Sequence, residues 1–154
     1  MKILAIDPGN IESAYVLMGE DYKPLEFGKV DNNKLLEYMQ ILIYGKVVIE
    51  MVASYGMAVG ATVFETCVWI GKYLQASGVP TERIFRKDVK MNLCGQTRAK
   101  DSNIRQALID RFGVVGTKKQ PGWFYGFKSD IWAAYAVGVT YFDTKPSEAF
   151  AEWD

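Results

Sequence analysis

Two acidic side chains come directly after short apolar runs of the sequence. Asp7 follows residues 3–6, and Glu50 follows residues 47–49. A continuous apolar run is typical of a strand covered on both faces, so each carboxylate would lie at the edge of a hydrophobic core. Two carboxylates that meet there repel each other unless a cation lies between them. The pair indicates a metal ion or a reacting group; the alternative is a turn at Asp7 and an exposed strand end at Glu50.

Two further acids open predicted helices. Asp101 begins a helix that runs to Arg111, and Asp130 lies in the first turn of a later, alanine-rich helix. Acids at these places also cap helices and offset the helix dipole, so a structural role stands beside the chemical one. The sequence contains no histidine, which excludes Ser-His and Cys-His catalysis and histidine-ligated zinc. Carboxylate oxygens without His or Cys suit a hard cation such as Mg²⁺ or Mn²⁺.

Alternating strands and helices must position these acids. Three strands joined by short links predict an antiparallel meander, and a fourth strand that returns from a helix is expected to pair with the first, which brings Asp7 and Glu50 together. The helix at 61–76 is apolar on more than one side, which favours burial by its own sheet and by a partner subunit. The predicted strands cover residues 3–7, 13–19, 25–30, 46–50 and 83–86, and the predicted helices cover residues 33–45, 61–76, 87–93, 101–111 and 128–139.

Length and composition indicate one globular domain. We place it at residues 1–143, followed by a loosely held tail at 144–154. Hydrophobic residues make up 49% and charged residues 23% of the chain, as in ordinary globular proteins. No apolar stretch approaches the length of a membrane span, so we expect a soluble, cytoplasmic protein without a membrane partner. Cys67 and Cys94 belong to no paired motif and are predicted to be free thiols.

Basic residues are distributed unevenly although the net charge is zero. Residues 83–128 hold 11 of the 18 basic side chains and three of the 18 acidic ones, a net charge of +8 that is balanced by −8 elsewhere. Such asymmetry favours a polyanionic partner, and solvated helix faces are the plainer explanation. The candidate contacts to nucleic acid in this segment are Arg86, Lys87, Lys90, Arg98, Lys118 and Lys119.

Two less regular segments are candidates for the same surface. In the loop after Glu50, Tyr55 and Met57 could stack on bases or wedge between them, or else pack against the domain. The connection at 113–126 is rich in glycine, lysine and aromatic residues and is expected to be mobile; it would either touch a nucleic-acid backbone or cover the core.

Five motifs, taken in order, resemble those of the RuvC-type Holliday junction resolvases, especially their phage-encoded relatives. They are Ile-Asp-Pro-Gly at 6–9 with Ser13 downstream, Val-Ile-Glu at 48–50, Val-Lys at 89–90 before a basic loop, Lys-Asp-Ser-Asn-Ile at 100–104 and Ser-Asp at 129–130. The resemblance implies an α/β, ribonuclease H-like fold with a five-stranded mixed sheet in the order 3-2-1-4-5 and helices on both faces. It also implies a homodimer that acts on opposite strands of a four-way DNA junction, in the cytoplasm of a bacterial host if the gene is phage-encoded.

The same resemblance implies a metal site. Asp7, Glu50 and Asp130 match three metal-binding acids of the family, which would hold two Mg²⁺ ions, with Mn²⁺ as a substitute and no small-molecule cofactor. The ions would promote hydrolysis of a phosphodiester of branched DNA. Bacterial members usually carry one more Asp three residues before the last of these acids, where this chain has Phe127.

The fourth carboxylate is therefore an open point. Either Asp101 supplies it, with Lys100 in contact with the scissile phosphate, or three acids suffice. Two other activities are alternatives to junction resolution. The chain could bind branched DNA without cleaving it, or it could be another ribonuclease H-like nuclease that acts on RNA–DNA hybrids.

Overall fold

One mixed sheet of five strands forms the centre of the computed structural model, which describes residues 1–145. The strand order is β3-β2-β1-β4-β5, which confirms the prediction. The first three strands pair antiparallel, and β1, β4 and β5 run parallel. Nearly all of the predicted tail at 144–154 lies outside the described residues. The strands are β1 (Ile3–Asp7), β2 (Glu12–Met18), β3 (Pro24–Asp31), β4 (Lys46–Met51) and β5 (Thr81–Phe85).

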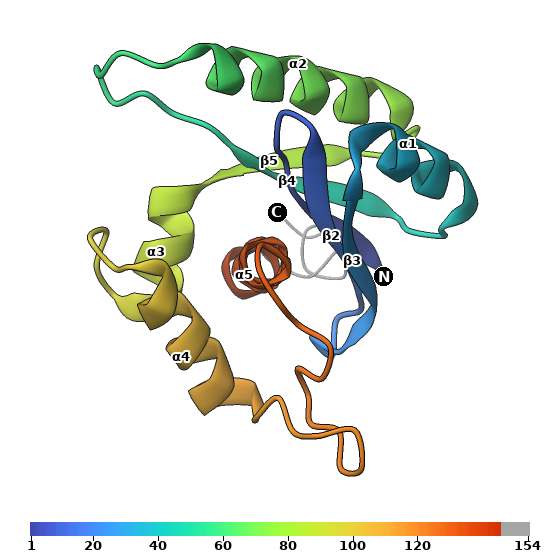
Figure 1. Cartoon of the computed structure of the whole chain (residues 1–154), viewed down its shortest axis with the longest axis vertical. Helices are drawn as coiled ribbons and strands as arrows, with labels where there is room; N and C mark the ends of the chain where they lie inside the picture. Colours follow the sequence, from blue (N-terminus) through green and yellow to red (C-terminus); the bar gives the residue numbers. More distant parts are fainter. Residues whose placement is uncertain (146–154) are drawn as a thin grey trace, which may run out of the picture.

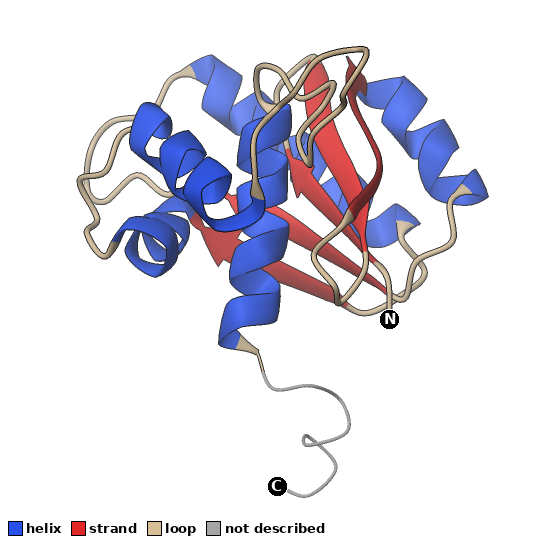
Figure 2. Cartoon of the chain, turned by 90° about the horizontal axis from the view of Figure 1, so that it is seen from below, coloured by secondary structure: helices blue, strands red, loops and turns tan. Residues whose placement is uncertain are grey.

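Helices cover both faces of this sheet. In Figure 1, α1 and α2 lie on one side of it and α3, α4 and α5 on the other. Helix α5 packs directly on the strands, and α3 and α4 pack against α5 (Figure 2). Within residues 1–145, no helix is both long enough and apolar enough to span a membrane. The helices are α1 (Asn32–Ile41), α2 (Ala61–Ala76), α3 (Arg86–Cys94), α4 (Asp101–Phe112) and α5 (Ile131–Thr144).

The apolar run of β1 explains why both faces are covered. Residues 3–6 are all fully buried, as predicted for a strand with core on each side. Ile3 belongs to the cluster under α3, α4 and α5, whereas Leu4 and Ile6 belong to the cluster under α1 and α2. Cys67 and Cys94 are free thiols, as predicted.

A glycine lets α5 lie close to the sheet. A Cβ atom at Gly138 would collide with the Met18 sulfur atom and would lie 3.2 Å from the Ala5 Cβ atom. The small residues of α5 permit this close approach. The charge of Asp130, the residue directly before α5, acts on Asp7, so the start of α5 lies near the end of β1 that carries Asp7.

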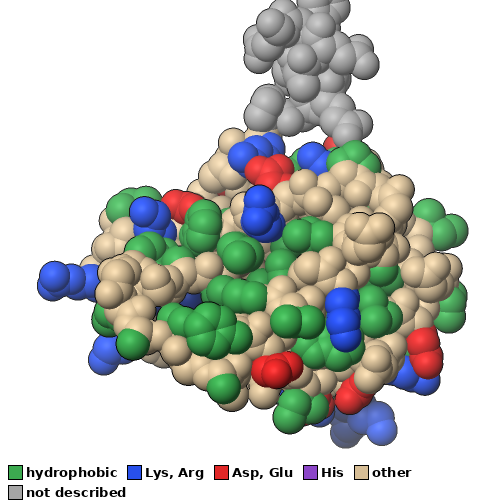
Figure 3. Space-filling view, turned by 90° about the horizontal axis from the view of Figure 1, so that it is seen from above, with side chains coloured by type: hydrophobic (Ala, Val, Ile, Leu, Met, Phe, Trp, Pro, Cys, Tyr) green, Lys and Arg blue, Asp and Glu red, His purple; other side chains and the backbone are tan. Residues whose placement is uncertain are grey.

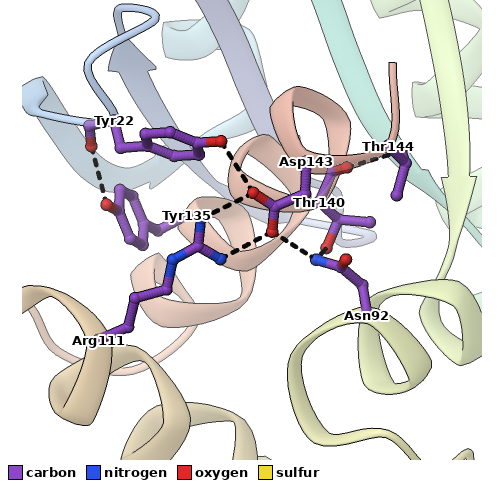
Figure 4. Close-up of polar contacts among 7 residues, drawn as sticks. All are labelled: Tyr22, Asn92, Arg111, Tyr135, Thr140, Asp143 and Thr144. Carbon is purple, nitrogen blue, oxygen red and sulfur yellow. Dashed lines mark hydrogen bonds and ion pairs between the residues drawn. The ribbon is translucent and has the colours of Figure 1, made fainter. Parts of the chain in front are cut away.

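The other end of α5 is fixed by a polar network around Asp143 (Figure 4). Arg111 of α4 donates two hydrogen bonds of 2.8 Å to its carboxylate, and Asn92 of α3 donates a third of 2.8 Å. The Tyr22 hydroxyl, from the turn between β2 and β3, donates a fourth of 2.8 Å. Tyr135 in turn donates to the Tyr22 carbonyl oxygen at 2.8 Å. One carboxylate thus ties together four separate parts of the chain.

The connection at 113–126 forms a tight hairpin. Gly116 and Pro121 form an isolated antiparallel bridge, and a Cβ atom at Gly122 would collide with the carbonyl oxygen of Val114. Phe124 is fully buried, so this connection does cover the core. Lys118 and Lys119 are exposed at its tip.

Candidate active site

Asp7 and Glu50 lie side by side at one end of the central strands. Asp7 is the last residue of β1, and Glu50 is the penultimate residue of β4. The two strands are parallel, and Ile6 is paired with Ile49, so the next residue on each strand is an acid. This pairing is the one predicted from the order of the elements. The Glu50 side chain is 14% exposed, which places its charge at the margin of the core.

The pKa of Asp7 shows that a nearby cation would stabilise its ionised form. Burial is the largest effect that raises the pKa of the Asp7 carboxyl, followed by the charge of Glu50 and a hydrogen bond with it, and then by the charge of Asp130. Arg86 acts in the opposite direction but only partly offsets them, and the pKa of Asp7 rises to about 9. Without further positive charge, burial and the neighbouring acids therefore favour a shared proton on this pair of carboxyl groups.

Asp130 lies directly before α5, which begins at Ile131, three residues later than predicted. It is the N-cap residue, yet its side chain makes no capping hydrogen bond, so its structural alternative is reduced to the favourable interaction of a negative charge with the helix dipole. Instead its carboxylate, 52% exposed, lies 2.8 Å from the Lys29 ammonium group. The pKa of Lys29 is raised mainly by this hydrogen bond and also by the charges of Glu12 and Asp7.

Asp101 does not cap α4, which removes capping as the alternative role of this acid. The N-cap residue is Lys100: its carbonyl oxygen accepts from the Ile104 N–H at 3.1 Å, and its backbone N–H donates to the Asn103 side-chain oxygen at 2.9 Å. Asp101 is the first helical residue, and its carboxylate forms an ion pair with Arg86. Arg86 also donates to a Glu50 oxygen at 3.2 Å. Asp101 is thus joined to the acid pair through a guanidinium group.

The acids have the oxygen donors that a hard divalent cation prefers, but their side chains are not arranged around a common point. Within residues 1–145, no three acids stand close enough together to ligate one ion as they are arranged. The donor atoms are all carboxylate oxygens, and positive charge from Arg86 and Lys29 already lies against Glu50 and Asp130. Asp130 is largely exposed and can exchange its ammonium partner for an ion without unfolding anything.

Lys29 is the site residue that the sequence did not reveal. It sits in a strand of alternating polarity, where a lysine is ordinarily a solvent-facing residue. The signal lies in the strand registers. Asp7 pairs with Ala14, and Ala14 pairs with Lys29, so the acid and the base lie in one row across three strands.

The candidate DNA contacts differ in their availability. Tyr55 and Met57 are 60% and 72% exposed, so the loop after β4 does not pack them against the domain. Lys87 lies over the Tyr55 ring, with its nitrogen 5.7 Å from the ring centroid. Arg86 is engaged with two acids. Of the remaining candidates, Lys90 is half-buried, and Arg98, Lys100, Lys118 and Lys119 are exposed.

Comparison with known proteins rests on structure alone. No protein-family model matches the sequence, and no curated protein does. The Thermus thermophilus RuvC structure superposes with a TM-score of 0.66 over 92% of this chain and 93% of that chain, at 20% sequence identity. The chain has the RuvC fold. A second structure, T. thermophilus RuvC in complex with Holliday junction substrate, gives a TM-score of 0.67 with 92% of each chain covered, at 18% identity. The five-stranded sheet with helices on both faces is therefore a fold that this chain shares with RuvC.

Proposed function

We propose that this protein is a structure-selective DNA endonuclease of the RuvC type that resolves Holliday junctions and other branched DNA. The observation that carries the proposal is a group of acids on the RuvC fold, at the ends of β1 and β4 and at the start of α5. The charges of Glu50 and Asp130 both raise the pKa of Asp7, so the three acids lie near one another. The structure of T. thermophilus RuvC with a Holliday junction substrate supports branched DNA as the partner. The motifs resemble the phage-encoded branch most.

Asp7, Glu50 and Asp130 would hold the metal ions, with Asp101 as the fourth acid. Two Mg²⁺ ions, or Mn²⁺ in their place, supply Lewis acidity that lowers the pKa of water and stabilises charge on a leaving 3′ oxygen. The chain itself fixes Asp7 and Glu50 on adjacent strands, so that their spacing is set by the sheet. Lys100 would contact the scissile phosphate from the start of α4.

Exposed cations would hold the DNA arms. Lys118 and Lys119 are exposed at the tip of the hairpin at 113–126, and Arg98 lies in the loop before α4. Contacts of this kind go to phosphates, so they strengthen binding in a salt-dependent way and carry no sequence information. Tyr55 and Met57, exposed on the loop after β4, would stack on or separate bases next to the cleavage site.

A second copy of the chain would cover α2. Phe64 and Val68 are 61% and 55% exposed, one helical turn apart, and Gly71 continues the same stripe. Figure 3 looks onto the side of α1 and α2 and shows hydrophobic side chains gathered on that face. Two such stripes packed together would place two active sites on one junction, as cleavage of opposite strands requires.

Substitution of Asp7 tests the proposed activity. With a synthetic four-way junction and Mg²⁺, we expect the wild type to cleave and Asp7→Asn to cleave roughly a thousandfold more slowly or worse, because the metal site loses its central charge. Junction binding, measured by gel shift with EDTA, should stay within about twofold. Asp110→Asn, an exposed acid on α4, is the matched control and should cleave normally.

The outcomes separate the alternatives. Binding of the junction without cleavage by the wild type would make this a branched-DNA binding protein. Cleavage of an RNA–DNA hybrid in preference to junctions and flaps would make it a different ribonuclease H-like nuclease. Loss of both cleavage and binding in Asp7→Asn would assign Asp7 a structural role.

A further inference from the structure

Three buried polar side chains meet beneath the turn that follows Asp7. Ser13 of β2, Asn32 at the start of α1 and Tyr73 of α2 are each at most 1% exposed. Ser13 donates to the Asn32 side-chain oxygen at 2.6 Å, and Tyr73 donates to the same oxygen at 2.8 Å. Buried polar groups of this kind lower stability unless every one of them is paired, so their presence in a core calls for an explanation.

The network forms hydrogen bonds with both the N–H and the carbonyl oxygen of one residue, Gly9. The Gly9 N–H donates to the Ser13 hydroxyl oxygen at 3.1 Å, and its carbonyl oxygen accepts from the Asn32 amide at 2.9 Å. The backbone N–H of Asn32 also donates to the carbonyl oxygen of Ile11 at 2.9 Å, which fixes the far side of the same turn. A Cβ atom at Gly9 would collide with the Glu12 carbonyl oxygen, so the turn is tightly closed.

Gly9 lies two residues after Asp7, with only Pro8 between them. Proline restricts its own backbone, so little freedom remains between the fixed Gly9 and the end of β1. Ser13 also precedes Ala14, the residue that is paired with Asp7 across the sheet. Burial raises the pKa of Tyr73 to about 12, so its hydroxyl keeps the proton that it donates.

We infer that Ser13, Asn32 and Tyr73 are positioning residues that hold the Asp7 carboxylate beside Glu50 in the geometry that metal binding and cleavage require. The inference rests on the proposed function. It assigns the three side chains a role that packing alone does not explain, because apolar residues of similar size would fill the same space without tethering Gly9.

The test uses the full chain and two variants, one that removes a direct hydrogen bond to Gly9 and one that does not. Ser13→Ala removes the acceptor for the Gly9 N–H and a donor to Asn32. Tyr73→Phe removes a donor to Asn32 and a hydroxyl 3.0 Å from that of Ser13, but no group that bonds to Gly9 directly. Thr66→Val is the matched control, because it deletes a buried hydroxyl from the same helix that bonds only to the Thr62 carbonyl oxygen within that helix. Calorimetric titration with Mn²⁺ alone and cleavage of a synthetic four-way junction are measured for each, well below the unfolding temperature.

We expect Ser13→Ala to bind Mn²⁺ about tenfold more weakly and to lose about tenfold in kcat, as for other outer-shell groups of metal sites. Tyr73→Phe should show the same changes to a smaller degree, and Thr66→Val should match the wild type. The dissociation constant for the junction in EDTA should not move. A merely structural role would lower the unfolding temperature and leave Mn²⁺ affinity and kcat unchanged, which would overturn the inference.

Failure of the proposed function is distinguishable from failure of this inference. If the wild type binds Mn²⁺ but cleaves no branched DNA, the proposed activity is wrong, and the Mn²⁺ titrations still decide the role of the network. If the wild type neither binds Mn²⁺ nor cleaves, both proposals fall. If Ser13→Ala does not fold, Tyr73→Phe carries the test.

Discussion

At the scale of single residues, basic side chains of the protein neutralise part of the negative charge of the candidate site. Arg86 bridges Glu50 and Asp101, and Lys29 lies on Asp130. Because the Glu50 side chain is only 14% exposed, its charge depends on a partner more than a surface acid does. The two basic residues therefore do at the metal-free site part of what metal ions would do.

This balance makes a prediction for Arg86. Arg86→Gln should destabilise the metal-free protein by about 1–2 kcal/mol, between the effects expected for exposed and for buried ion pairs. Mn²⁺ should recover most of the loss, because it supplies the missing positive charge. Thermal unfolding with EDTA and with Mn²⁺ measures both effects. Lys34→Gln, which breaks an exposed pair with Glu37, is the control and should change neither curve. Equal unfolding temperatures of Arg86→Gln and wild type in EDTA would contradict the prediction.

At the scale of elements, the Asp143 network fixes where α5 ends. Burial alone would raise the pKa of the Asp143 carboxyl, but hydrogen bonds from Arg111, Asn92 and Tyr22 outweigh it and hold the pKa below its ordinary value of 3.8. A carboxyl whose pKa is depressed by folding stabilises the native state above its unfolded pKa. That contribution is lost as the pH falls through the pKa of the folded form.

The corresponding experiment compares the wild type with Asp143→Asn from neutral pH to about pH 2.5. The wild type should be more stable by a constant amount from neutral pH down to about pH 4, and the difference should shrink below that. Taking the difference between two chains cancels the titration of other groups, Asp7 included. Thermal unfolding at each pH supplies the data. A gap that stays constant down to the lowest pH would show that Asp143 does not act through its charge.

The elements themselves were largely predictable from the sequence, and the contacts between them were not. Apolar runs predicted β1, β2 and β4, alternating polarity predicted β3, a short segment around Ile84 and Phe85 predicted β5, and the resemblance supplied the strand order. Helix α1 ends at Ile41, short of the predicted Gly45, because helix ends depend on packing that local patterns do not encode. The ion pairs of Arg86 and Lys29 join residues far apart in sequence, so they emerge only once strand registers and helix positions are known.

At the scale of the whole molecule, two surface features indicate binding partners. In the basic segment at 83–128, Arg86 and Arg111 form internal ion pairs, whereas the exposed Arg98, Lys118 and Lys119 are among the residues that remain for a polyanion. The apolar stripe on α2 points away from the core of its own chain. Exposed apolar side chains that form a continuous helix face mark a protein interface more often than isolated ones do.

The stripe makes the last prediction. Val68→Glu should convert the proposed dimer into a monomer, because two carboxylates would be buried against each other at the centre of the interface. Light scattering after size exclusion measures the mass. Ile43→Glu is the control, since Ile43 is 81% exposed on the loop between α1 and β4 and should leave the mass unchanged. The monomer should still cut, but it should nick one strand of a junction per binding event, because a second active site is no longer held on the opposite strand. Paired cleavage by a monomeric Val68→Glu would show that resolution does not need this interface.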